Sequence, residues 1–86
     1  MTDFTWTENS RTVFDEGVKA APAPFRAVTQ RSLLKGLTRL VGDGGEVHES
    51  DVVRAIEQNS PAPFIPMGMK AIAPYLTVAA PKGDRD

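Results

Sequence analysis

Apolar residues with helical spacing dominate the middle of the chain. Between residues 24 and 41 they fall within one arc of a helical wheel, and they are Leu33, Leu34, Leu37, Leu40 and Val41. Pro24 suits the first helical turn, where its missing amide costs nothing, and Gly42 suits a left-handed cap at the other end. The pattern therefore predicts one long helix over residues 24–41, followed by a glycine-rich turn.

A weaker apolar pattern upstream predicts a short helix over residues 8–20, with an apolar edge formed by Val13, Phe14 and Val18. The hydroxyl of Thr7 is a suitable cap because it can accept a hydrogen bond from a free amide of the first turn. Phe25 and Val28 lie off the leucine arc of the long helix. We expect these two side chains to face the first helix or Trp6.

A third helix is predicted after the glycine-rich turn. Val47 suits a short extended link, and either His48 or Ser50 then caps the helix. The buried edge of this helix is formed by Val52, Val53 and Ile56. The succession of short, long and short helices predicts a small all-α, three-helix domain over residues 1–60.

Residues 61–80 differ from the rest because prolines alternate there with large apolar side chains, and Lys70 is the only charge. Such a segment is too apolar for a solvated linker and too rich in proline for one long helix. A helix of about two turns is expected from Pro66 to Ala73. We therefore predict a proline-rich apolar docking extension over residues 61–80 and a disordered tail over residues 81–86.

The tetrapeptide Pro-Ala-Pro-Phe occurs twice, at residues 22–25 and 61–64. Each copy precedes a predicted helix, and proline fixes its own backbone angle while restricting the residue before it. The residues that flank the two copies barely agree. We interpret both copies as signals for the start of a helix rather than as a true sequence repeat.

The bulk composition excludes several classes of protein. The chain has 86 residues, 41% of them hydrophobic, and its lack of cysteine excludes disulfides, iron–sulfur ligation and thiol nucleophiles. The net charge of −1 and the pI of about 5.7 argue against a general nucleic-acid binder. The sequence contains neither a signal-peptide pattern nor an apolar run of about 18 residues, so we expect a cytoplasmic protein without a membrane span.

His48 is the only histidine and therefore the first candidate for catalysis or metal binding. Metal sites combine several nitrogen, sulfur or carboxylate ligands, and the chain has no second imidazole and no thiolate. We expect His48 to be a residue at the start of a helix. The sequence accordingly predicts no catalytic residue, no metal site and no cofactor.

Two surfaces are candidates for binding a partner. One is a basic face formed by Arg31, Lys35 and Arg39, in a stretch without any acidic residue from position 17 to 42. The other is the apolar extension, whose candidate contact residues are Phe64, Met67, Met69, Ile72 and Tyr75. Each surface has an alternative interpretation, because the basic face can simply be solvated and the extension can complete the core.

Several residues of the helical region follow the pattern of a known family, and they are Trp6, Thr7, Pro22, Arg26, Val47 and Ala55. Over residues 6–56 the chain resembles the PCP-reductase domain, the C-terminal domain of the B subunit of light-independent protochlorophyllide reductase. The resemblance implies a small helical domain linked to a nitrogenase-like reductase. In that enzyme the domain helps to enclose a porphyrin-like substrate, while the cluster and substrate chemistry lie in larger domains.

From the resemblance and the two candidate surfaces we expect a non-catalytic accessory or docking subunit of a larger redox or photosynthesis-related complex, in the context of chlorophyll biosynthesis. The basic helix and the apolar extension would contact a partner protein. Two alternatives stay open. One is a histone-like or other helical DNA-associated regulator, against which the acidic pI argues, and the other is a small tetrapyrrole-binding carrier.

Overall fold

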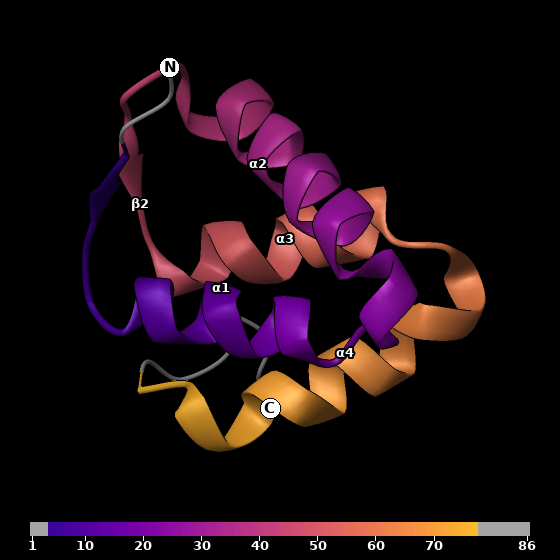
Figure 1. The fold of residues 1–86 in the computed structure, drawn as a ribbon. Coiled ribbons are helices and arrows are strands. Elements are labelled where there is room, and N and C mark those ends of the chain that lie inside the picture. The colour runs from indigo at the N-terminus through magenta and orange to yellow at the C-terminus, as the bar shows by residue number, and fades with distance from the viewer. Residues whose placement is uncertain (1–3, 78–86) are drawn as a thin grey trace.

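The computed structural model describes residues 4–77, and nearly all of its regular structure is helical (Figure 1). Within this range the α-helices are α1 (Ser10–Lys19), α2 (Arg26–Val41), α3 (Glu49–Asn59) and α4 (Ile65–Ile72). Short turns of 3-10 helix are η1 (Ala23–Phe25), η2 (Ala62–Phe64) and η3 (Ala73–Tyr75), and two-residue strands are β1 (Thr5–Trp6) and β2 (Glu46–Val47). The predicted all-α class is confirmed. Predictions for residues 1–3 and 78–86, including the tail 81–86, lie outside the described residues.

The hydrophobic core lies between two pairs of packed helices, α2 with α3 and α1 with α4, while α1 and α3 join the pairs (Figure 1). Leu33 and Leu37, from the predicted arc of the long helix, are almost completely buried because residues four apart share one helix face. The remaining buried hydrophobic residues of the helices are Val13, Phe14, Val52, Ala55, Ile56 and Ile72. Ile72 has no exposed surface, so the helix within the apolar extension contributes to the same core.

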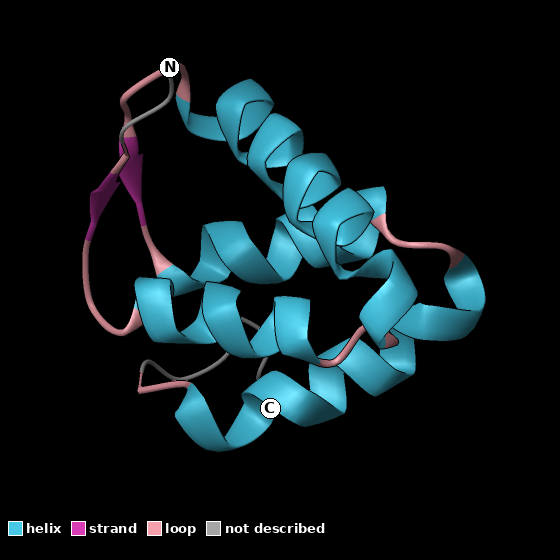
Figure 2. Ribbon diagram, in the orientation of Figure 1, coloured by secondary structure: helices cyan, strands magenta, loops and turns pink. Residues whose placement is uncertain are grey.

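Two parallel strands connect the start of the chain to the link before α3. Thr5 pairs with Glu46 and Trp6 pairs with Val47, which confirms the extended link predicted at Val47. The Trp6 ring packs against Phe14, with ring centroids 5.3 Å apart. Figure 2 shows the strand pair at one end of the helical body.

The two halves of the chain have the same order of elements. The first half runs β1, α1, η1 and α2, and the second half runs β2, α3, η2 and α4. A Pro-Ala-Pro-Phe segment lies directly before α2 in the first half and before α4 in the second half. The interpretation of both tetrapeptides as helix starts is therefore confirmed.

The starts of the helices differ by one or two residues from those expected. Thr7 does not cap the first helix, because its hydroxyl donates to the carbonyl of Val47 at 2.9 Å instead. Glu8 then adopts a positive φ of 56°, which is incompatible with a right-handed helix, so α1 starts at Ser10. The long helix starts at Arg26 rather than at residue 24, because the tetrapeptide before it forms the η1 turn.

Candidate functional site

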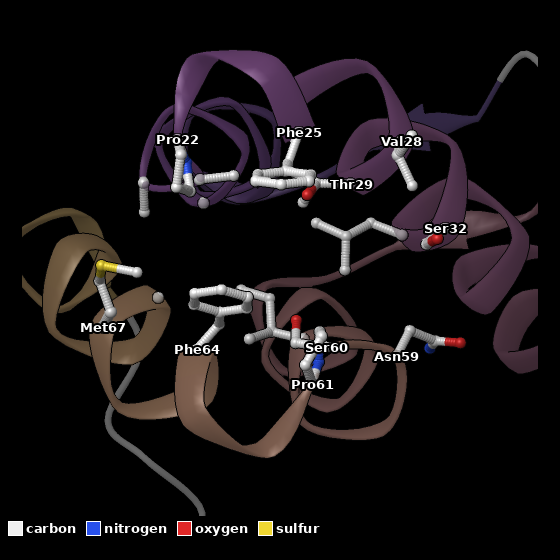
Figure 3. Close-up of a pocket in the computed structure, with 16 residues that line it drawn as sticks. Pro22, Phe25, Val28, Thr29, Ser32, Asn59, Ser60, Pro61, Phe64 and Met67 are labelled. Atoms are coloured by element: carbon white, nitrogen blue, oxygen red, sulfur yellow. The ribbon is translucent and has the colours of Figure 1, made fainter.

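An apolar groove lies where the ends of α1 and α3 meet the starts of α2 and α4 (Figure 3). Its cavity volume is about 250 Å³, and 16 residues line it, none of them charged. The residues that form its walls are Pro22, Phe25, Val28, Pro61, Phe64 and Met67. We refer to this feature as the groove.

Two copies of the same proline turn form opposite walls of the groove. Pro22 has φ −55° and ψ 147°, and Pro61 has φ −58° and ψ 141°, so both copies enter the turn from extended backbone. In each copy the phenylalanine amide donates to the carbonyl of that proline at 2.8 Å. Phe25 and Phe64 therefore occupy equivalent positions, and they point toward each other across the opening (Figure 3).

The walls of the groove expose an unusual amount of apolar surface. Phe25 is 55% exposed, Val28 54%, Phe64 41% and Met67 42%. Isolated exposed apolar residues are ordinary on a protein surface, but a contiguous patch of them is typical of a binding surface. Fully burying one such side chain is worth about 1.5–3 kcal/mol, so a partner that covers the groove gains a substantial driving force.

The floor of the groove is formed by Leu33, Ile56 and two glycines. A Cβ atom at Gly17 would lie 3.2 Å from Cδ1 of Ile56, and one at Gly68 would lie 3.5 Å from Cγ2 of the same residue. Residue 17 therefore lets α1 pack closely over α3 because it has no side chain. Since Leu33 and Ile56 are buried, the concave shape is built into the core and exists before any partner binds.

The predicted basic face lies on α2, the helix whose first turns line the groove. Arg31, Lys35 and Arg39 are all exposed on α2, and none of them lines the groove. Arg31 follows the wall residue Val28 by three positions, so these two are neighbours on the helix surface. Within residues 4–77 none of the three basic side chains makes an ion pair, so their charges are open to solvent.

The structure separates the five residues predicted within the apolar extension. Phe64 and Met67 line the groove. Tyr75 is 38% exposed and lies outside the groove. Met69 is half-buried against the core, and Ile72 is completely buried. Only Phe64 and Met67 are therefore brought together with the basic helix at one surface.

Phe25 and Val28 are the site residues that the sequence did not assign to a binding surface. The expectation that they face the first helix or Trp6 is corrected, because both are more than half exposed and line the groove. The reason is the η1 turn, which directs Phe25 toward Phe64 of the second turn. The available signal was the repeated tetrapeptide, which places a phenylalanine at the same position of both turns.

A polar cluster lies where α1 and α3 start. His48 is the residue before α3, as predicted, with Nδ1 3.2 Å from Oε2 of Glu8 and Nε2 3.1 Å from Oε1 of Glu46. The pKa of His48 is raised above its usual 6.5, mainly by the hydrogen bond with Glu8. Partial burial lowers this pKa, and the hydrogen bond with Glu46 raises it further. The cluster holds the two helix starts together.

The described residues contain a defined groove, but their acidic and imidazole groups do not assemble as metal ligands. No group of three or more His, Cys, Asp or Glu side chains within residues 4–77 could hold a metal ion. None of the helices in that range combines the length and the apolar character that crossing a bilayer requires.

The fold and the groove define a small all-α domain with an uncharged, largely apolar groove on its surface. No family model, no curated protein and no solved structure matches this chain. The resemblance to the PCP-reductase domain therefore stays a prediction from the sequence.

Proposed function

We propose that the protein is a docking subunit whose groove binds an apolar surface of a partner protein. The observation that carries this proposal is the pair of exposed aromatic rings, Phe25 and Phe64, which face each other over an uncharged floor. Protein interfaces gain most of their binding energy from a few large side chains buried in fitted pockets. Because the floor belongs to the core, little additional ordering is needed when a partner binds.

The open walls of the groove favour a protein partner over an enclosed small-molecule ligand. Pockets for drug-sized ligands and cofactors bury most of the ligand surface, whereas the wall side chains Phe25, Val28, Phe64 and Met67 are each more than 40% exposed. A tetrapyrrole carrier needs a larger and more enclosed site, so docking is the better supported of these two functions.

The predicted link to a redox or photosynthesis-related complex rests on the sequence resemblance alone. Two residues that carry the resemblance serve the fold in this chain. Trp6 pairs with Val47, and Arg26 donates from Nε to the carbonyl of Ala21 at 3.0 Å, which ties the end of α1 to the start of α2. The docking function is supported by the groove and does not depend on which complex contains the partner.

Co-purification with matched variants tests this function. The wild-type chain, the Phe25→Ser/Phe64→Ser variant and a Tyr75→Ser control are each tagged, expressed at native level, cross-linked and analysed by mass spectrometry. We expect the double variant to lose a partner that the control retains, because Tyr75 is an exposed aromatic residue outside the groove. Equal recovery of the same proteins by all three chains would contradict the proposed function.

A further inference from the structure

Basic side chains are exposed on α2 and α4, the two helices whose first turns line the groove. No acidic residue occurs between positions 17 and 42 or between positions 58 and 77, the stretches that include both proline turns and both of these helices. Exposed cations in these stretches include Arg31, Lys35, Arg39 and Lys70. Glu16 and Glu57 are each next in sequence to a residue that lines the groove. Oε2 of Glu16 lies 3.3 Å from Nζ of Lys19, so this carboxylate is paired. The groove is therefore apolar inside and predominantly positive at its border.

The backbone around the groove offers no strand edge to a partner. In the described part of the chain the two strands pair with each other and lie at the other end of the helical body (Figure 2). The turns at the groove contain four prolines, which lack an amide hydrogen: Pro22, Pro24, Pro61 and Pro63. A segment that enters the groove finds no strand to pair with, and an α-helix needs none because it satisfies its backbone hydrogen bonds internally.

Building on the proposed docking function, we infer that the partner contributes an amphipathic helix with acidic residues along one flank. The apolar edge of this helix, with anchors at positions i, i+3, i+4 and i+7, places one large side chain between Phe25 and Phe64. The acidic flank faces Arg31, Lys35 and Arg39. From residue 31 to residue 39 the basic row extends about 12 Å along α2, which matches about two turns of the partner helix.

Charge complementarity of this kind selects and orients the partner more than it strengthens binding. Each exposed ion pair contributes little on its own, and salt screens it. Three such pairs together correspond to a preference of about tenfold for an acidic over a neutral flank at low salt. The apolar anchors supply most of the affinity, and the basic row determines which helix is accepted.

Selection from a phage-displayed library of helical peptides tests the inference. The library has apolar residues at four groove-facing positions and random residues elsewhere, and it is selected on the wild-type chain and depleted on the Phe25→Ser/Phe64→Ser variant. We expect the enriched peptides to be acidic. They should bind the Arg31→Glu/Lys35→Glu/Arg39→Glu variant at least about tenfold more weakly, with the difference fading at high salt.

Each outcome has a separate meaning. Peptides that depend on the groove but are neutral or basic overturn the acidic-helix inference while leaving the docking function in place. A library without any groove-dependent peptide overturns the inference of a helical partner, while the docking function is decided by the co-purification experiment. Sedimentation of the chain alone is the last experiment. If the wild-type chain is a dimer and the Phe25→Ser/Phe64→Ser variant is a monomer, a second copy of the chain fills the groove. This result also overturns the inference.

Discussion

Glu8, which precedes α1, and Glu49, the first residue of α3, each accept a backbone amide hydrogen from the start of the other helix. Oε1 of Glu8 accepts from the amide of Glu49 at 3.0 Å, and Oε2 of Glu49 accepts from the amide of Asn9 at 3.0 Å. Free amides at a helix start need acceptors, and the helix dipole favours negative charge there. Glu49 is only 2% exposed and also accepts from the amide of Thr77 at 2.8 Å and from its hydroxyl. One buried carboxylate thus joins α1, α3 and the segment after η3.

Replacing Glu49 should destabilise the fold strongly. The Glu49→Ala variant leaves the amides of Asn9 and Thr77 without their charged acceptor, and we expect the free energy of unfolding to fall by about 2–4 kcal/mol. Urea unfolding followed by circular dichroism measures this loss. The control is Glu57→Ala, an exposed change on the same helix that should alter stability by less than about 0.5 kcal/mol. Equal effects of the two changes would refute the assigned role.

The apolar extension should be required for folding. Ile72 is completely buried, and its Cγ2 atom would lie 3.5 Å from a Cβ atom at Gly17, so α4 packs directly on α1. We expect truncation after Ser60 to abolish cooperative thermal unfolding. The Ile72→Ala change should cost about 2–5 kcal/mol, whereas Met67→Ala in the same helix, at an exposed position, should cost much less. A truncated chain with full helicity and a cooperative transition would show that the core does not need α4.

The titration of His48 should report its contact with Glu8. In an NMR titration we expect the pKa of His48 to lie above 6.5, and to decrease more in Glu8→Gln than in Glu46→Gln, because the hydrogen bond with Glu8 is the main cause of the shift. A folded-state pKa above the unfolded value means that the protonated imidazole stabilises the fold. This contribution is complete below about pH 6.5 and is lost as the pH rises through the folded-state pKa. A measured pKa at or below 6.5 would contradict the geometry of the cluster.

The groove should bind an apolar dye without any change in the fold. Anilinonaphthalene sulfonate fluoresces on exposed apolar surface, and its sulfonate suits a positive border. We expect its fluorescence to decrease in the Phe25→Ser/Phe64→Ser variant and to persist in Tyr75→Ser. Thermal unfolding of all three chains provides the control, and each chain should keep a cooperative transition because the replaced side chains are only partly buried. Undiminished fluorescence of the double variant would show that the dye binds elsewhere.

The sequence predicted those features that depend on local periodicity. Leu33 and Leu37 repeat with the period of a helix, so the long helix and its buried face could be predicted. The pairing of the two short strands could not be predicted, since two residues are too few to show alternation. The role of Thr7 could not be predicted either, because its hydroxyl donates to the carbonyl of Val47, a residue that is distant in sequence.

The groove could be predicted only in part, for a similar reason. Phe64 and Met67 were recognised as contact residues from the composition of the extension, whereas Phe25 was not. Its exposure follows from the meeting of two proline turns that lie far apart in the chain. No pattern within one helix encodes that meeting, although the repeated tetrapeptide encodes the identical shape of the two turns.

The prolines of the two turns also bear on how the protein behaves at high concentration. Exposed phenylalanines next to free backbone amides would promote intermolecular β-sheet formation and aggregation. Beside Phe25 and Phe64 the chain instead carries Pro24 and Pro63, which cannot donate a hydrogen bond to a growing sheet. Prolines at these positions are expected to lower the tendency of the two exposed aromatic segments to join an intermolecular sheet.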